Sequence, residues 1–253
     1  MKILSVNVGL PKEVTWQGKI VTTGIFKKPV NMPVMMRTLN LGGDQQADLT
    51  VHGGVNKAVY VYPSEHYGYW QVELPGVDLP WGMFGENFTT EGLLEEAVYI
   101  GDRFRIGETE VMATEPRMPC CKLGIKFGRP DIIKRFLASR RTGFYFAVVR
   151  EGMVVTGDAI ELIGREQQEI SVGDITRLYA FEKDDLKGLR RAVGSIRFLK
   201  VGRAIFYISS INRSASFYGK KLPRSETEKT GINRIRWILY NSNPGLIPKS
   251  CWK

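Results

Sequence analysis

Short stretches in which apolar and polar residues alternate dominate the first 163 residues of the chain. Turns that contain Gly, Pro, Asn or Asp separate these stretches, and short strands broken by frequent turns are typical of a sheet closed into a barrel or sandwich. We therefore predict a mainly β fold here, with residues 144–149 and 153–155 forming a hairpin. The expected strands cover residues 1–9, 14–16, 18–23, 58–62, 98–100, 103–106, 109–114, 144–149, 153–155 and 157–163.

Two segments within this part have a helical pattern instead. Residues 63–70 begin with Pro and Ser, and Ser64 is a candidate N-cap because its side chain can accept a backbone N–H. Residues 130–141 begin with Pro and Asp, carry one apolar face and end in basic residues, as helices commonly do. We predict a helix in each segment.

The pattern changes to helical after a polar linker at residues 165–170. Ser171 and Asp174 have the spacing of a capping box, and apolar residues follow at helical intervals. The C-terminal segment loses this periodicity, becomes basic and contains Ser, Asn and Pro, so we expect it to be poorly ordered. The predicted units are a β domain at residues 1–165, a small α-helical domain at 171–205 and a basic tail at 206–253.

The net charge of +10 lies almost wholly in that tail. Residues 1–200 hold 26 Lys and Arg against 24 Asp and Glu, whereas residues 201–253 hold 10 against 2. A basic protein prompts the hypothesis of nucleic-acid binding, but the balanced body and the absence of a recognised reader motif argue against it. Deleting the tail would abolish any salt-sensitive DNA binding that exists.

Three cysteines, two of them adjacent, do not make a disulfide framework. A reducing, cytoplasmic setting is therefore expected. The N-terminus lacks the features of a signal peptide, and no run approaches the ~18 apolar residues of a membrane-spanning helix. We expect a soluble protein that does not enter a membrane.

The adjacent cysteines, Cys120 and Cys121, carry the most distinctive chemistry. They lie beside Arg117 and Lys122, and nearby cations favour the thiolate, which is the form that attacks electrophiles and binds metals. Pro119 restricts the backbone, so a constrained turn or an extended segment is expected. One thiolate here would suit a soft metal. The alternative is a pair of buried structural cysteines.

A second candidate site surrounds Gly53 and Gly54. Paired glycines allow the backbone to approach a ligand closely, and His52 and Lys57 flank them, so a bound anion would meet N–H, imidazole and ammonium groups. The spacing of a Walker A loop is absent. The alternative is an ordinary turn before a strand.

Polar residues elsewhere leave further alternatives open. Glu86 and Asn87 lie between a glycine and an aromatic residue, where they would form a turn or contact a ligand. His52 and His66 are the only histidines and would exchange protons near neutral pH. Together with the cysteine pair they match no zinc spacing, so zinc is set aside.

Taken together, these motifs resemble the MOSC family (molybdenum cofactor sulfurase C-terminal domain), in its bacterial YiiM-like branch. They occur in the family's order and span most of residues 1–163, and residues 171–198 resemble the three-helix domain that follows in this branch. The tail after about residue 205 does not match it. The matching motifs are Asp48, His52-Gly53-Gly54, Lys57-Ala58-Val59-Tyr60, Glu65-His66-Tyr67, Gly85-Glu86-Asn87-Phe88-Thr89-Thr90-Glu91-Gly92, Ile100-Gly101-Asp102-Arg103 and Pro116-Arg117-Met118-Pro119-Cys120-Cys121-Lys122-Leu123.

The resemblance implies a β-barrel-like domain that binds the molybdenum cofactor (molybdopterin). The family motif places the metal ligand at Cys120 and leaves Cys121 at a variable position. The implied donors to the pterin phosphate are Lys57, Arg117 and the backbone of Gly53 and Gly54. Glu86 and Asn87 would anchor the pterin or the substrate, and His52 or His66 would supply protons.

The implied activity is the reduction of N-hydroxylated compounds such as N-hydroxylated purine base analogues, a detoxification reaction. No flavin, NAD or iron–sulfur motif is evident, so electrons are expected from a separate reductase. The alternative is a protein that carries the molybdenum cofactor, or sulfur on Cys120, without reductase activity. A monomer and a homodimer both remain open.

Overall fold

The computed structural model describes residues 1–48, 53–166, 170–182 and 184–198. The predicted basic tail and the last residues of the predicted helical domain, 199–205, lie outside these residues. The strands are β1 (Lys2–Val8), β2 (Lys12–Trp16), β3 (Lys19–Thr23), β4 (Lys28–Val30), β5 (Val34–Met36), β6 (Val59–Pro63), β7 (Phe88–Glu91), β8 (Arg103–Ile106), β9 (Thr109–Pro116), β10 (Phe144–Arg150), β11 (Gly152–Val154) and β12 (Ile160–Gly164). The helices are the short 3₁₀ helix η1 (Val55–Lys57), α1 (Glu65–Glu73), α2 (Cys121–Phe127), α3 (Ile132–Ala138), α4 (Val172–Ala180) and α5 (Leu186–Phe198).

One eight-stranded sheet organises the molecule, in the order β12-β8-β9-β10-β6-β7-β1-β4. Neighbouring strands in this sheet are antiparallel, except for β6 and β7, which are parallel and are connected through α1. The N-terminal end of β1 also meets the residues that lead into β12, where the Ile3 N–H donates to the Asp158 oxygen at 3.0 Å. Lys2 and Ala159 form a further bridge there. These bonds close the sheet into a barrel, with β4 paired to the other end of β1, and confirm the mainly β prediction.

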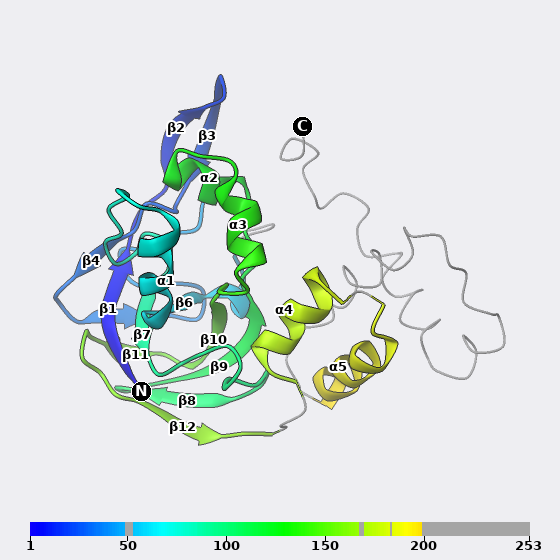
Figure 1. Ribbon diagram of the computed structural model, residues 1–253. Helices are drawn as coiled ribbons and strands as arrows, with labels where there is room; N and C mark the ends of the chain where they lie inside the picture. The colour runs from blue at the N-terminus through cyan, green and yellow to red at the C-terminus, as the bar shows by residue number, and fades with distance from the viewer. Residues whose placement is uncertain (49–52, 167–169, 183, 199–253) are drawn as a thin grey trace.

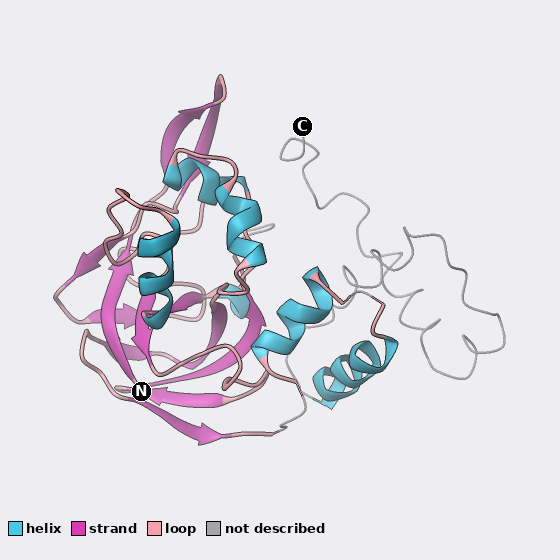
Figure 2. Ribbon diagram, in the orientation of Figure 1, coloured by secondary structure: helices cyan, strands magenta, loops and turns pink. Residues whose placement is uncertain are grey.

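Two groups of apolar side chains stabilise this arrangement. The interior of the barrel is filled by the inward side chains of its strands, which alternate in burial as a pleated sheet requires. A second, aromatic group lies outside the barrel between β6 and the helices α1, α2 and α3, which share one side of the molecule (Figures 1 and 2). Its buried members are Tyr60, Tyr62, Tyr67, Trp70, Leu74, Phe84, Leu123, Ile132 and Phe136.

The helix α4 packs against the barrel rather than standing apart from it. Val172, Ile175 and Leu178 belong to the same buried cluster as the barrel interior. The predicted capping box is present, because the Ser171 hydroxyl accepts the Asp174 N–H at 3.0 Å and the Asp174 carboxylate accepts the Ser171 N–H at 3.2 Å. The division into separate β and helical domains stays a prediction.

Three local predictions were wrong. The strand β11 pairs with β5 and not with β10, so the expected hairpin does not form. The cysteine pair was expected on a turn or an extended segment, which holds for the extended Cys120 but is wrong for Cys121, the first residue of the helix α2. Ser64 occupies the N-cap of α1, but its side chain accepts no capping hydrogen bond.

Within the described residues, no helix combines the length and the apolar character that spanning a membrane requires.

Candidate functional site

A cavity of about 90 Å³ opens where the end of β3, the start of α2 and the middle of the sheet meet. Its wall combines one thiol, several cationic side chains, two tyrosines and backbone from two loops. It is lined by Thr23, Gly24, Ile25, Lys27, Gln45, Gln46, Ala47, Lys57, Tyr60, Gly85, Asn87, Arg117, Met118, Cys120, Lys122 and Tyr145.

The backbone separates the two adjacent cysteines. Cys120 is extended, with φ −133° and ψ 179°, and serves as the N-cap residue of α2, whereas Cys121 is the first residue of that helix. Extended and helical conformations direct successive side chains differently. Of the two thiols only Cys120 lines the cavity, which is the cysteine that the sequence singled out.

Arg117 places a buried cation beside Cys120. Its guanidinium carbon lies 5.2 Å from the ring centre of Tyr60 and 5.0 Å from that of Phe136. Burial disfavours the charged form, but the nearby Tyr60, Tyr145 and Cys120 outweigh this effect and hold the pKa of Arg117 above its usual value. Its Nη1 is buried and has no hydrogen-bond partner in the described part of the chain.

An unpartnered donor on a buried arginine is costly, so it indicates a missing acceptor. A backbone hydrogen bond fixes the position of this arginine, because the Arg117 N–H donates to the Gly143 oxygen at 3.1 Å. Gly143 has φ +64°, and a Cβ there would lie 2.3 Å from the Val61 oxygen, so only glycine fits.

Further cations line the same cavity. Lys27 is buried and forms an ion pair with the buried Asp44, and Lys57 lies 3.8 Å from the Glu115 carboxylate. Burial lowers the pKa of Lys27, although Asp44 opposes this effect. Lys122 contributes from α2. Among the described lining residues no side chain is a carboxylate, so the cavity favours an anionic ligand.

Tyr145 completes the wall opposite these cations. Burial raises its pKa to about 12, although Arg117 opposes this. The ring of Tyr145 lies 5.4 Å from that of Tyr60, whose hydroxyl donates to the Thr142 oxygen at 2.8 Å. Both tyrosines therefore stay protonated near neutral pH and present neutral aromatic surface.

Asn87 lines the cavity, but neighbouring groups already use its amide. Its Nδ2 donates to Asp44 at 2.9 Å and to the Asn7 oxygen at 3.2 Å, and its Oδ1 accepts the Tyr60 N–H at 3.1 Å. Asn87 thus holds Asp44, and through it Lys27, in place. The predicted contact of Asn87 with a ligand stays a prediction.

Glu86 is fully buried and does not line the cavity. Its carboxylate accepts hydrogen bonds from the Tyr67 hydroxyl, from the Thr89 hydroxyl at 3.0 Å and from the Gly82 N–H at 2.8 Å. Burial raises the pKa of Glu86, and these donors oppose the rise. The geometry indicates that this carboxylate holds residues 82–89 together.

His66 also lies away from the cavity lining. Its Nε2 contacts the Glu95 carboxylate at 2.7 Å, and the other oxygen of Glu95 accepts the Gly143 N–H at 2.7 Å. His66 therefore supports the backbone that holds Arg117. His52 lies outside the described residues.

The paired glycines are close to η1 but do not line the cavity. Gly54 has φ +96° and forms the N-cap of η1, which carries Lys57 to the wall. Their role as anion ligands stays a prediction.

The sequence reasoning missed three residues of the cavity wall: Lys27, Tyr145 and Tyr60. Only the fold brings these three together. Tyr60 belongs to one of the motifs quoted from the sequence, as does Lys122, which also lines the cavity.

Comparisons with known proteins found a matching family model and several similar proteins. A family model described as "MOSC domain" matches residues 48–161. A curated Bacillus subtilis protein, "Uncharacterized protein YflK", is 41% identical over 81% of this chain and 92% of its own length. "Protein YiiM" of Escherichia coli is 38% identical over 61% of this chain and 67% of its own length.

A Gibberella moniliformis protein named "Reductase" is 34% identical over 70% of this chain, which spans only 32% of that longer protein. The crystal structure of YiiM from Geobacillus stearothermophilus superposes with a TM-score of 0.67 and is 33% identical, covering 83% of this chain and 98% of the other.

Proposed function

Because this chain belongs to the YiiM-like branch of the MOSC family, we propose that it is a molybdenum-cofactor-dependent oxidoreductase that reduces N-hydroxylated compounds. N-hydroxylated purine base analogues are the substrates we expect, with electrons from a separate reductase in the cytoplasm. The observation that carries the proposal is Cys120 on the wall of a cationic cavity, next to Arg117, whose buried Nη1 has no hydrogen-bond partner among the described residues.

The described residues fit the cofactor in two respects. A phosphate on the pterin would supply the acceptor that Arg117 Nη1 lacks, because arginine pairs strongly with phosphate oxygens. Lys122 would add positive charge on the same wall, and so would Lys27 and Lys57, although Asp44 and Glu115 pair with these two from outside the lining. The Cys120 thiolate would then ligate the metal, as a soft ligand suited to a redox-active centre.

The proposed reaction is a two-electron reduction. The N–O bond of the substrate breaks, two electrons and two protons are taken up, and an amine and water leave. The cofactor supplies the redox chemistry, and the protein supplies binding and orientation. Arg117 favours the thiolate of Cys120, and Tyr60 and Tyr145 shape the wall with neutral rings.

The test compares the wild type, Cys120→Ala and Cys121→Ala, all produced in a host that makes the cofactor. We expect about one molybdenum per chain in the wild type and in Cys121→Ala, and little in Cys120→Ala. Reduction of an N-hydroxylated purine by a reduced viologen dye should follow the metal content.

Full metal content without reduction of any N-hydroxylated compound would instead support the carrier alternative. Absence of molybdenum from all three folded proteins would overturn the proposal.

A further inference from the structure

Three lysines gather outside the cavity, and the proposed reaction does not use them. The lysine cluster consists of Lys12 from β2, Lys28 from β4 and Lys126 from α2. The Nζ of Lys12 lies 3.8 Å and that of Lys126 5.3 Å from the ring centre of Phe26. Segments far apart in the sequence therefore direct cations to one place.

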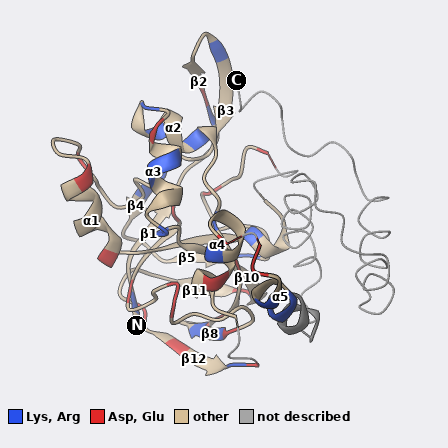
Figure 3. Ribbon diagram, turned by 45° about the vertical axis from the view of Figure 1, so that its right-hand side comes forward, with Lys and Arg blue, Asp and Glu red and all other residues tan. Residues whose placement is uncertain are grey.

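These charges repel one another, although the Phe26 ring and the buried Glu86 offset part of this repulsion. Burial lowers the pKa of Lys126, and Lys12, Lys27 and Lys28 lower it further, while the buried Glu86 raises it. None of the three cluster lysines forms an ion pair with a described residue. Figure 3 shows Lys and Arg on the β2–β3 hairpin, β4, α2 and α3. A concentration of like charge that costs stability indicates an anion that binds there.

The lysine cluster continues the cavity outward along α2. Lys122 lines the cavity, and Lys126 follows it by four residues, so the two side chains share one helix face about 6 Å apart along the axis. None of the cluster lysines lines the cavity itself. An anion at the cluster would thus lie beside the cavity and not at the place of Arg117 and Cys120.

We propose that the lysine cluster is a phosphate subsite for the substrate, so that nucleotides carrying an N-hydroxylated base are preferred over the free base. This inference rests on the proposed function. The base would enter the cavity toward Cys120, and the 5′-phosphate would lie among Lys12, Lys28 and Lys126. A compact phosphate matches three converging ammonium groups, whereas a nucleic-acid strand needs a longer basic stripe than this nearly balanced body offers.

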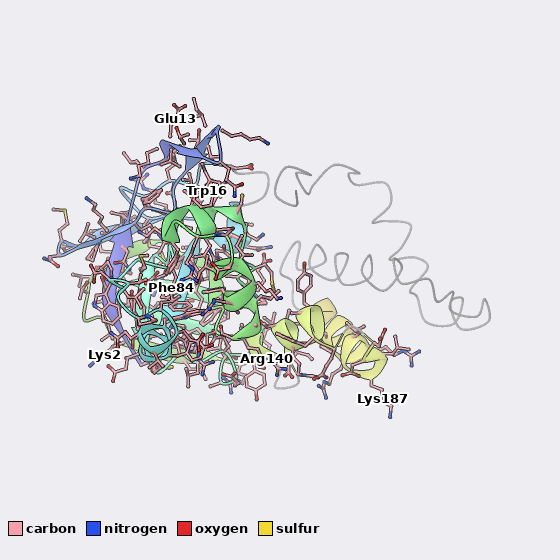
Figure 4. All side chains as sticks on the ribbon, turned by 45° about the horizontal axis from the view of Figure 1, so that its top comes forward. Lys2, Glu13, Trp16, Phe84, Arg140 and Lys187 are labelled. Atoms are coloured by element: carbon pink, nitrogen blue, oxygen red, sulfur yellow. The ribbon has the colours of Figure 1, made fainter. Side chains whose placement is uncertain are left out.

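The test uses the holoenzyme and one N-hydroxylated purine in three forms: free base, nucleoside and nucleoside 5′-monophosphate. Reduced viologen supplies the electrons. We expect kcat/KM for the monophosphate to exceed that for the nucleoside at least tenfold at low salt, and the advantage to shrink as salt rises. The triple variant Lys12→Gln, Lys28→Gln, Lys126→Gln should lose this advantage. The control is Lys187→Gln, because Figure 4 shows Lys187 far from the hairpin residues Glu13 and Trp16.

Binding gives a second readout that needs no turnover. Titration calorimetry with adenosine 5′-monophosphate and with adenosine should show binding that depends on the phosphate in the wild type and in Lys187→Gln, and not in the triple variant. Molybdenum content should be the same in all three proteins.

Equal kcat/KM for nucleoside and monophosphate would overturn the inference, while reduction of the free base would leave the proposed function standing. Loss of molybdenum from the triple variant would assign the lysines to the cofactor instead. Binding of single-stranded DNA in preference to the mononucleotide would assign them to nucleic acid. If none of the three forms of the purine were reduced, only the proposed function would be contradicted. The calorimetric titration would still test the phosphate subsite.

Discussion

Arg117 and Cys120 lie three residues apart, and the fold brings both to one cavity wall. The chain leaves β9 at Pro116, passes Pro119 in extended form and enters α2 at Cys121. Arg117 is buried against the Tyr60 and Phe136 rings, which leaves its charge poorly screened by water. We therefore expect Arg117 to make a large contribution to the reactivity of Cys120.

Replacing Arg117 by methionine should make Cys120 less reactive, because the thiolate loses its nearest buried cation. We expect the rate of alkylation by iodoacetamide at pH 7 to fall about tenfold, because a smaller fraction of the thiol is then ionised. The measurement uses a background with Cys121→Ser and Cys251→Ser. Arg141→Met is the control, because Arg141 also covers an aromatic ring, 4.1 Å from Tyr69, but does not line the cavity. Equal rates in both variants would contradict the role of Arg117.

Glu86 should make stability depend on pH. Its pKa is raised in the folded protein because burial disfavours the carboxylate, so the native state binds its proton more tightly than the unfolded chain does. The resulting stabilisation is complete below the ordinary pKa of glutamate and is lost as pH rises through the raised value. We therefore expect the Tm of the wild type, relative to that of Glu86→Gln, to increase as the pH falls from 8 to 4. A difference in Tm that stays constant with pH would show that Glu86 does not titrate in this window.

At the level of elements, the N-terminal ends of α4 and α1 can be compared. Ser171 and Ser64 both stand at N-cap positions, but only Ser171 makes the capping bond, to the Asp174 N–H. Ser171→Ala should therefore lower the free energy of unfolding by about 1 kcal/mol. Ser64→Ala is the matched control, and we expect it to change stability by less than about 0.5 kcal/mol. Urea denaturation measures both, and equal losses would contradict this distinction.

The elements that the sequence predicted well are those with a local cause. The capping box of α4 follows from Ser171 and Asp174 alone, and the strands β8 and β9 follow from alternation between turns. The partner of β11 depends instead on where β5 lies in space, which no local pattern encodes. The prolines before Cys120 were correctly interpreted as breaking regular structure, but they do not prevent a helix from starting directly after them.

At the scale of the molecule, some residues of the candidate site were likewise predictable from a local motif and others were not. Cys120 and Arg117 were predictable because one short motif carries both, whereas Lys27 and Tyr145 reach the wall from distant strands and loops. His66 was predicted as a proton donor and Glu86 as an anchor for the pterin or the substrate. Their burial and their bonds to Glu95 and Tyr67 appear only when the barrel and the aromatic cluster are assembled.

Whether α4 belongs to the barrel or to a separate domain has a direct thermodynamic consequence. Leu178 is fully buried in the cluster that fills the barrel, and α4 also meets the barrel through the Thr142 and Thr176 hydroxyls, 3.4 Å apart. Leu178→Ala should therefore destabilise the whole molecule by about 2–5 kcal/mol, as removal of a buried leucine usually does.

The measurement follows urea unfolding by far-UV circular dichroism and by the part of the tryptophan fluorescence that is lost in Trp70→Phe, which reports on Trp70 in the aromatic cluster. We expect one cooperative transition with both probes, shifted to lower urea in Leu178→Ala. Val72→Ala is the control, because Val72 is 80% exposed and contributes little to either cluster. If α4 unfolded on its own, the fluorescence transition would stay where it is in the wild type while the dichroism curve split into two steps, and α4 would then be part of an independent domain.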